Sequence, residues 1–369
     1  MDKKVAIFKL IENYRRLLYF FHGHSSRGIL PAGIPCNVDD PTKAITHSDV
    51  VHPCVRFVKE GFEGHQWWMV YTPLYGGDDS LENPRLCYAD SVTDGAPTEW
   101  EYYCTIRNCP KTGYNSDPTI FFKEGRLYVF WREVDTPEAN KLSASYITTG
   151  CYVEHKNVVY LCDPQLIEPL GREAIHDDRE ICPTLIDRGD TKRFYTMHLT
   201  LAPSFIFNIP SQISSFIYRH NIFFLLKALG LYSNIKSHGV AMWDSNNIEG
   251  KYHYIHTIPF ANQSRLYQPW HMDIVQNENK TNLYAVVQTS LFFADICLTY
   301  SRDGEQFTFF KKPLLTSWSI GMSGIYKPTA LVVDNRFYLY YTARDNDDFR
   351  LNRLYVTSME WSTLLQMLK

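Results

Sequence analysis

The stretch Asp117-Pro118-Thr119-Ile120 is followed by a short polar turn and then by the aromatic run Leu127-Tyr128-Val129-Phe130-Trp131. The same order of residue types occurs four more times. These copies begin at His52-Pro53-Cys54-Val55, Cys182-Pro183-Thr184-Leu185, Lys327-Pro328-Thr329-Ala330 and, with Met in place of Pro, His271-Met272-Asp273-Ile274. Repeats of this length, each built from several short β-rich runs, are typical of β-propellers. Five copies therefore predict an all-β fold, a five-bladed β-propeller.

The spacing of the copies agrees with one blade per copy. The first three prolines are 65 residues apart, the next interval to Met272 is 89 residues, and the last is 56. A four-stranded blade needs about 40–50 residues. The long third interval indicates an insertion, and residues 201–236 interrupt the strand pattern there. We therefore expect a helical insertion in the third blade, at residues 201–236.

The chain ahead of the first copy has a different pattern. Residues 5–21 look like an amphipathic helix, so residues 1–45 are expected to form an N-terminal helical or irregular segment. Residues 46–369 are then a single propeller domain. Charged residues such as Lys9 and Glu12 interrupt the apolar N-terminal run, and no small-residue cleavage site follows, so the sequence gives no sign of a secretory signal.

Composition excludes several classes of function. The net charge is −3 and the charges are interspersed, which argues against a nucleic-acid partner. The nine cysteines include no C-x-x-C pair, and several lie in predicted strands, which favours reduced cysteines and a cytoplasmic protein. Neither the cysteines nor the histidines show metal-ligand spacing along the chain. The sequence therefore predicts no metal-ligating residues and no cofactor, while an axial calcium or chloride ion stays an open alternative.

Each blade is predicted to have four strands. The x-Pro-Thr phrase opens the innermost strand, because Pro is tolerated at the first residue of a strand. The aromatic run is the second strand. The third strand includes residues 141–146 in the second blade. Asp-Gly turns such as Asp94-Gly95 precede the outer strands.

The innermost strands of a propeller converge on its axis, so the residues around each opening Pro are expected to share one funnel. Carboxylates are prominent in that predicted ring, which also contains Cys182 and Tyr326. A pair of carboxylates can serve glycosyl transfer, with one as acid and the other as base or nucleophile. The candidate catalytic residues are Asp117, Asp273, Glu180 and Asp49. The alternative is structural, because Asp before Pro-Thr often only fixes a turn.

Other polar and aromatic residues near the same ring could contact a substrate. Aromatic faces pack on sugar rings, and His, Arg and Lys bind hydroxyl or anionic groups. The candidate substrate-binding residues are His52, His271, Trp131, Arg132, Trp270, Lys327, Arg344 and Glu82. Glu82 has a second interpretation as a capping residue ahead of a third strand.

A family resemblance rests on residues 49–53, the run Trp67-Trp68-Met69-Val70, the phrase Glu82-Asn83-Pro84 and the triplet Ser116-Asp117-Pro118. This part of the chain resembles a bacterial group of five-bladed propellers related to glycoside hydrolases of family 43, the arabinanases and xylosidases. The resemblance implies a carbohydrate-related role, with a catalytic base on the first inner strand and further acids on later blades. The chain departs from that pattern in two places: His52-Pro53 stands where Asp-Pro is expected, and no Glu-Gly-Pro phrase follows.

Three functions stay open from the sequence. The leading one is a glycosidase-like hydrolase that acts on an oligosaccharide or polysaccharide through paired carboxylates in the funnel. The second is a non-catalytic glycan-binding propeller, and the third is a phosphorylase in which Lys327, His271 and Arg344 hold phosphate. The insertion at residues 201–236 could pack on the propeller rim, contact a membrane surface or a partner, or cover the cleft.

Overall fold

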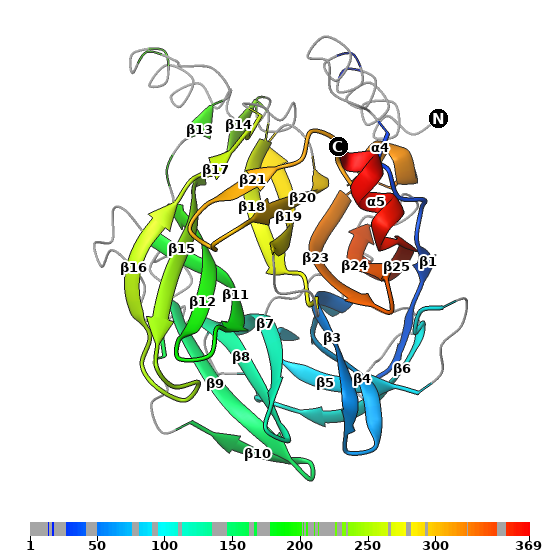
Figure 1. Cartoon of the computed structure of the whole chain (residues 1–369), viewed down its shortest axis with the longest axis vertical. Coiled ribbons are helices and arrows are strands. Elements are labelled where there is room, and N and C mark those ends of the chain that lie inside the picture. The colour runs from blue at the N-terminus through cyan, green and yellow to red at the C-terminus, as the bar shows by residue number, and fades with distance from the viewer. Residues whose placement is uncertain are drawn as a thin grey trace.

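The computed structural model of the chain contains five β-sheets arranged radially around one axis (Figure 1). This confirms the predicted five-bladed propeller. The described residues are 14, 17, 27–41, 50–75, 81–90, 95–109, 113–134, 146–161, 166–167, 178–200, 202, 204–205, 210, 213, 226, 231–233, 235–264, 267–277, 282–291, 294–322, 324–344 and 352–369.

Each sheet is one blade, and we number the blades in chain order. Blade 1 contains β3 (Val50–Phe62), β4 (His65–Pro73), β5 (Arg85–Ala89) and β6 (Glu99–Thr105). Blade 2 contains β7 (Tyr114–Lys123), β8 (Arg126–Val134), β9 (Tyr146–Glu154) and β10 (Asn157–Tyr160). Blade 3 contains β11 (Asp178–Asp187), β12 (Lys192–Thr200), β15 (Lys236–Ser245) and β16 (His253–Ile258).

The last two blades carry additional short strands. Blade 4 contains β18 (Tyr267–Ile274), β19 (Leu283–Leu291), β20 (Asp295–Ser301) and β21 (Phe307–Phe309), joined by β17 (Phe260–Ala261) and β22 (Leu315–Thr316). Blade 5 contains β23 (Gly324–Val333), β24 (Arg336–Arg344) and β25 (Asn352–Glu360). Two short helices, α4 (Ser317–Ile320) and α5 (Trp361–Leu368), flank blade 5.

The ring is closed along the axis by the first strand of every blade. Strand β3 contacts β7, β7 contacts β11, β11 contacts β18, β18 contacts β23, and β23 returns to β3. A hydrophobic cluster fills each of the five interfaces between neighbouring blades, with Trp68 and Trp131 between blades 1 and 2 as one example. Flat aromatic and β-branched side chains suit these double-sided sheets, which explains the aromatic runs of the sequence.

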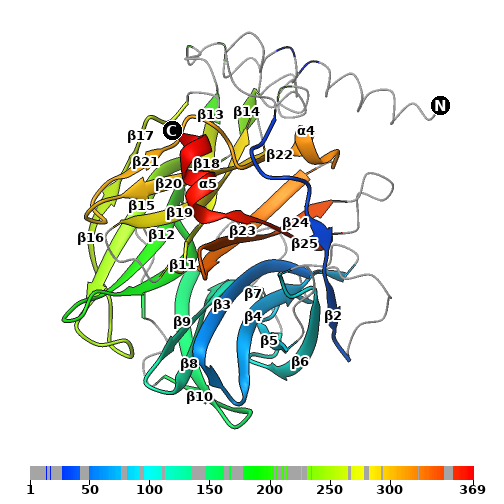
Figure 2. The ribbon, with the colours of Figure 1, turned by 45° about the vertical axis from the view of Figure 1, so that its right-hand side comes forward.

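An N-terminal strap ties the two ends of the ring together. Strand β1 (Ile34–Pro35) pairs with β25 of blade 5, and β2 (Asn37–Asp39) then pairs in parallel with β6 of blade 1 (Figure 2). Asp40 ends the strap, where its Oδ2 accepts hydrogen bonds from the Tyr71 and Tyr75 hydroxyls. Residues 34–39 therefore belong to the propeller sheets, although the sequence division places them in the segment 1–45.

The insertion of blade 3 lies between β12 and β15. Strands β13 (Ser204–Phe205) and β14 (Tyr232–Ser233) pair there as a two-stranded ribbon. Most of the predicted helix in residues 201–236, and most of the predicted N-terminal helix in residues 5–21, lie outside the described residues. Among the residues that are described, no helix has the length and apolar character needed to cross a membrane.

The opening prolines do not begin the inner strands, which corrects the sequence interpretation. Pro118 is the fifth residue of β7, inside a β-bulge where Asp117 and Pro118 together face Trp131. The other three prolines also lie inside β-bulges, as the register shifts between Val51 and Cys54, Ile181 and Thr184, and Tyr326 and Thr329 show. Proline has no N–H for the ladder, so a bulge is the other place where a strand accommodates it.

The residue ahead of each proline has a positive φ. The angles are 52° for His52, 51° for Asp117, 54° for Cys182 and 39° for Lys327. Non-glycine residues rarely adopt this conformation, and it is concentrated at functional sites. The bulge of blade 4 differs, because the unpaired residue there is Trp270, between Pro269 and His271. This irregularity, repeated in every blade, positions the candidate site.

Candidate metal centre on the propeller axis

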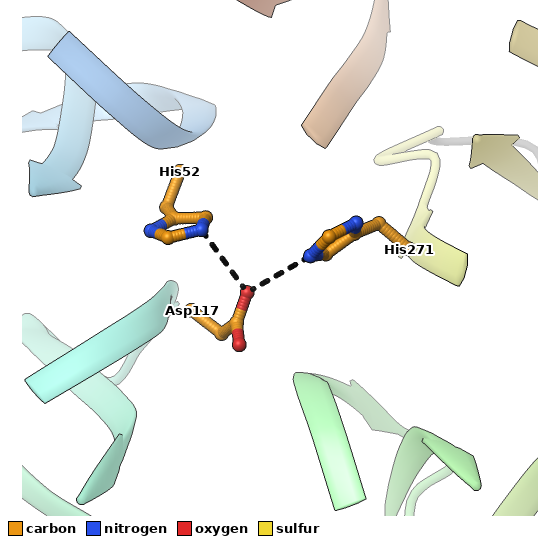
Figure 3. Close-up of side chains that lie close together, drawn as sticks. All are labelled: His52, Asp117 and His271. Carbon is orange, nitrogen blue, oxygen red and sulfur yellow. Dashed lines mark ion pairs between the residues drawn. The ribbon is translucent and has the colours of Figure 1, made fainter. Parts of the chain in front are cut away.

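Five residues, one from each inner strand and each in or next to its bulge, meet at the axis and form what we call the hub. The hub consists of His52, Asp117, Cys182, His271 and Lys327. All five are buried, with exposed fractions of 1–3%. Figure 3 shows three of them, His52, Asp117 and His271, directed toward one another from three different blades. The repeated phrase of the sequence therefore places one side chain per blade in the same cluster.

A single oxygen atom, Oδ1 of Asp117, is the centre of the hub. It lies 3.7 Å from Nε2 of His52 and 3.6 Å from Nε2 of His271. The Lys327 ammonium is 3.9 Å from the same oxygen, and the Cys182 thiol donates to it at 3.5 Å. Each of the other four hub residues thus faces one carboxylate oxygen.

The second oxygen of Asp117 is held by blade 2 itself. The Nε atom of Arg132 lies 3.2 Å from Oδ2, and the same guanidinium donates to the Ser116 hydroxyl. Burial alone raises the pKa of Asp117, but the charges of Arg132 and Lys327 outweigh it and hold the pKa well below its usual range. These cations favour the ionised form of Asp117, which argues against its use as a general acid.

Hydrogen bonding fixes the tautomer of His271. The backbone N–H of Lys327 donates to Oε1 of Gln288 at 3.0 Å, which identifies that atom as the amide oxygen. His271 Nδ1 lies 3.0 Å from the same oxygen and must therefore carry the proton. Burial lowers the pKa of His271 well below its usual value, so the ring is neutral. Its Nε2 consequently presents a lone pair to Asp117.

His52 is oriented in the same way. Its Nδ1 lies 2.9 Å from the Thr72 hydroxyl, which itself donates to the Val51 carbonyl, so Nδ1 is the donor. Its Nε2 accepts a hydrogen bond from the Tyr326 hydroxyl at 3.0 Å. Burial lowers the pKa of His52 to about 3, despite the opposing effect of Asp117. Both imidazoles are thus neutral, with Nδ1 protonated and Nε2 facing the hub.

This arrangement has the properties of a metal-binding site. The three ligand atoms lie within 4.8 Å of one another. The distances of 3.6 and 3.7 Å from Asp117 Oδ1 to the two Nε2 atoms are too long for hydrogen bonds. They are close to the distance of about 3.4 Å that separates two ligand atoms in a tetrahedral site when each ligand lies about 2.1 Å from the ion. Ligands must be deprotonated, and an acceptor on the other ring nitrogen orients a ligating His. Asp117 and both histidines are deprotonated at the atoms that face the hub, and Nδ1 of each histidine donates to an acceptor.

A second ring of residues lies one step further along the inner strands. This lower layer consists of Cys54, Thr119, Thr184, Asp273 and Thr329, the positions that follow each proline or Met272. Its carboxylate, Asp273, accepts a bidentate pair of bonds from Arg56 at 2.7 and 2.9 Å. Thr184 and Thr329 also donate to Asp273. Burial raises the pKa of Asp273, but Arg56 and these bonds lower it overall.

The structure separates the predicted catalytic residues. Asp117 is in the hub, whereas Asp273 is tied to Arg56 in the lower layer. Glu180 is buried in blade 3, where it accepts from Thr196 at 2.6 Å and lies 3.9 Å from His198. Asp49 lies outside the described residues. Two acid/base pairs follow from these candidates, Asp117 with Asp273 and Asp117 with Glu180. Neighbouring cations lower the pKa of both Asp117 and Asp273, which argues against the first pair, and the second stays a prediction.

The predicted binding residues divide in the same manner. His52, His271, Lys327 and Arg132 all surround Asp117. Trp131 does not face the funnel, because it is fully buried in the cluster between blades 1 and 2, which corrects that prediction. Arg344 lies at the exposed end of β24, while the hub is buried.

Two further predicted residues lie near the hub. Trp270 is partly exposed, and its ring centroid is 5.8 Å from that of His271. Glu82 is buried, and its charge is one of the factors that raise the pKa of Tyr326. The sequence interpretation missed Gln288 and Thr72, which lie on second strands and orient the two histidines. Such residues are found only when the inner and second strands are put in register.

The predicted absence of metal-ligating residues rested on spacing along the chain. The three candidate ligands come from blades 1, 2 and 4 and are separated by 65 and 154 residues. No local motif can reveal such a site. The repeated x-Pro phrase was the available signal, since it places equivalent residues at equivalent positions in successive blades.

A cavity of about 1030 Å³ opens at the other end of the axis. It is lined by the C-terminal ends of the inner strands, including Phe57, Leu185 and Val332. Arg56, which pairs with Asp273, is one of its lining residues. Its lining includes no hub residue, so this cavity is distinct from the candidate metal centre.

The fold and site define a five-bladed propeller with a polar, histidine-containing centre. No protein-family model matches the chain, and no curated protein matches it. An N-acetylgalactosamine deacetylase from F. plautii, solved with blood group B trisaccharide, is 16% identical and has a TM-score of 0.62; the match covers 93% of this chain and 98% of that one.

Glycoside hydrolases share the same architecture. A family 117 enzyme from Zobellia galactanivorans is 10% identical with a TM-score of 0.56, covering 90% of this chain and 91% of its own. A family 43 enzyme from Xanthomonas citri is 10% identical with a TM-score of 0.51, covering 85% and 88%. At these identities the likeness establishes the fold, and it agrees with the resemblance inferred from the sequence.

Proposed function

We propose that the protein is a carbohydrate-active hydrolase whose chemistry takes place at a divalent metal ion held by His52, Asp117 and His271. The observation that carries the proposal is the convergence of two imidazole Nε2 atoms on an ionised carboxylate oxygen, with Nδ1 of each ring already donating elsewhere. Imidazole and carboxylate ligands together suit first-row ions such as Zn²⁺.

The bond that we propose for cleavage is an acyl bond on a sugar, such as the amide of an N-acetyl group. Glycoside hydrolysis needs one carboxylic acid that holds a proton. Asp117 and Asp273 are both kept ionised by neighbouring cations, so they do not supply that acid. The deacetylase that matches 93% of this chain supports the choice of an acylated sugar as substrate.

The residues of the hub have separate roles in this proposal. His52, Asp117 and His271 would hold the ion, which when bound polarises a carbonyl group and lowers the pKa of a water molecule. Arg132 fixes the Asp117 carboxylate through Oδ2, leaving Oδ1 for the ion. Trp270, partly exposed beside His271, offers an aromatic face to the sugar ring.

The test combines metal binding with product analysis. The purified protein is treated with a chelator, and Zn²⁺ is then titrated calorimetrically into the wild type and into His271→Ala and Asp117→Asn. We expect one Zn²⁺ per chain in the wild type and at least a hundredfold weaker binding in both variants. Only the Zn²⁺-loaded wild type should release acetate from methyl N-acetylhexosaminides. Absence of Zn²⁺ binding by the wild type would refute the proposal.

Glycoside hydrolysis is the second candidate, because enzymes of families 43 and 117 share the propeller. The products distinguish the two candidates: a glycosidase releases new reducing ends, while a deacylase releases acetate and leaves the sugar chain intact. A protein that binds glycans and releases neither product would instead be the non-catalytic binding propeller.

A further inference from the structure

We propose that Tyr326 is a catalytic residue, and that its hydroxyl donates a hydrogen bond to the carbonyl oxygen of the acyl group while that bond is cleaved. This inference rests on the proposed function, since it assigns a role at the same metal centre. The contacts of Tyr326, its exposure and the competition for one lone pair support it.

Tyr326 lies beside the hub, in contact with both of its histidines. Its hydroxyl is 3.0 Å from Nε2 of His52, and its ring centroid is 5.2 Å from that of His52 and 4.7 Å from that of His271. Unlike the hub residues, Tyr326 is partly exposed. Because it precedes Lys327, the bulge of β23 fixes its position. A substrate that approaches the metal ligands from this side therefore meets the phenol.

The hydroxyl and a metal ion compete for the same acceptor. In the structure Tyr326 donates to His52 Nε2, which is also one of the three candidate ligand atoms. If His52 held an ion through this lone pair, the Tyr326 hydroxyl would have to donate elsewhere. The Tyr326 donor, 3.0 Å from His52 Nε2, would then be available to an acyl carbonyl group held at this site.

The proposed step conserves atoms and protons. Water adds to the carbonyl carbon, and the C=O bond becomes a C–O⁻ bond that Tyr326 stabilises without giving up its proton. The tetrahedral adduct then re-forms the C=O bond and expels the nitrogen, which receives the proton lost by the water. The products are a carboxylic acid and an amino sugar, and Tyr326 is unchanged.

The experiment compares Tyr326→Phe with Tyr88→Phe, a control that removes the hydroxyl bonded to Glu101 on the outside of blade 1. With Zn²⁺ loaded, Tyr326→Phe should lower kcat for acetate release by about 100- to 1000-fold while KM stays within about threefold. Its affinity for Zn²⁺ should rise by about two- to tenfold, because one competing hydrogen bond is gone. Tyr88→Phe should change neither quantity.

The outcomes separate this inference from the proposed function. If the wild type binds Zn²⁺ and releases acetate but Tyr326→Phe keeps its kcat within twofold, only the role of Tyr326 is wrong. Unchanged or weaker Zn²⁺ affinity in Tyr326→Phe would refute the competition, and this result does not depend on the choice of substrate. A wild type that does not bind Zn²⁺ would refute the proposed function together with this inference.

Discussion

The Nε2 atom of His271 lies 3.6 Å from the Oδ1 atom of Asp117, and each of these two atoms presents a lone pair to the other. Two acceptors that face each other in a buried, low-dielectric site repel unless a cation or a proton lies between them. Burial disfavours the protonated form of His271. The Cys182 thiol and the Lys327 ammonium face only Oδ1 of this pair, and a metal ion between the two atoms would satisfy both.

The first prediction concerns Gln288, the acceptor that fixes the His271 tautomer. Replacing it in Gln288→Leu removes the partner of Nδ1, so the ring loses its fixed orientation. We expect the affinity for Zn²⁺ to fall by about 10- to 100-fold, the usual loss when such a partner is removed. Calorimetric titration measures the change. Gln66→Leu, at an exposed residue bonded to the Lys59 carbonyl, is the matched control. Equal affinities in the two variants would contradict the orientation argument.

The second prediction concerns Lys327, whose ammonium competes with an ion for Oδ1 of Asp117. Burial lowers the pKa of Lys327, but Cys182 and the carboxylates of Asp117 and Asp273 raise it overall, so the ammonium stays charged. Removing this positive charge in Lys327→Met should raise Zn²⁺ affinity by about tenfold or more, because unit charges 4 Å apart interact by about 4 kcal/mol at an effective dielectric of 20. Weaker binding in Lys327→Met would mean that the lysine helps to build the site.

Much of this axial arrangement could be predicted from the repeat. Equivalent residues of the x-Pro phrase were expected to share one funnel, and they form the hub and the lower layer. Asp273 takes the position that Thr119 and Thr184 have in their blades, which follows from aligning His271-Met272-Asp273 with the other copies. The fold, the blade count and the residues at the axis are thus recoverable from one sequence pattern.

The direction of each side chain was harder to predict. Trp131 and Arg132 are neighbours on β8, so they point to opposite faces of the sheet. Arg132 reaches Asp117 while Trp131 packs between blades, and the aromatic character of the run gave no indication of which residue does which. The third strand of blade 2 was expected to include residues 141–146, but β9 begins at Tyr146, and residues 141–145 lie outside the described residues.

The prolines were misplaced for a physical reason. Proline at a strand start and proline in a bulge look alike in the sequence, because both positions lack a ladder hydrogen bond. Only the pairing register of the strands distinguishes the two positions, because in a bulge two residues of the inner strand lie opposite one residue of the second strand. The bulge also explains why chemically unlike residues, such as His52 and Lys327, adopt the same positive φ at equivalent positions.

The third prediction concerns pH and the two buried imidazoles. In the unfolded chain a histidine takes up a proton near pH 6.5, whereas folded His52 does so only near pH 3. The unfolded state therefore binds more protons below pH 6.5, and the free energy of unfolding falls with acid by up to about 1.4 kcal/mol per pH unit for each histidine. Asp117 has a lowered pKa, so its stabilising effect is lost only below about pH 4.

Urea unfolding of the metal-free protein between pH 7.5 and 4.5 measures this slope. His52→Gln should reduce the slope by roughly the share of one histidine. His155→Gln, which changes an exposed residue paired with Glu63, should leave it unaltered. An identical slope in His52→Gln and the wild type would show that His52 is not held neutral in the folded protein.

The fourth prediction concerns the Arg56–Asp273 pair of the lower layer. Asp273→Asn leaves a buried guanidinium without its counterion, so the free energy of unfolding should fall by about 3–5 kcal/mol. The double variant Arg56→Met/Asp273→Leu removes both charges and should recover at least half of that loss, because a buried pair can be replaced by apolar groups at little cost. Zn²⁺ affinity of the double variant should match the wild type. A large loss of affinity would return Asp273 to the functional centre.

The last prediction concerns Asp40, which anchors the strap that closes the ring. Its carboxylate is buried, accepts bonds from Tyr71 and Tyr75, and forms an ion pair with Arg85. Asp40→Ala should lower the free energy of unfolding by about 3 kcal/mol, because Arg85 loses its buried partner. It should also make residues 34–40 more sensitive to limited proteolysis. Asp39→Ala, at the exposed neighbouring residue, is the control. If both variants are equally stable and equally resistant, then strand pairing of β1 and β2 closes the propeller without this anchor.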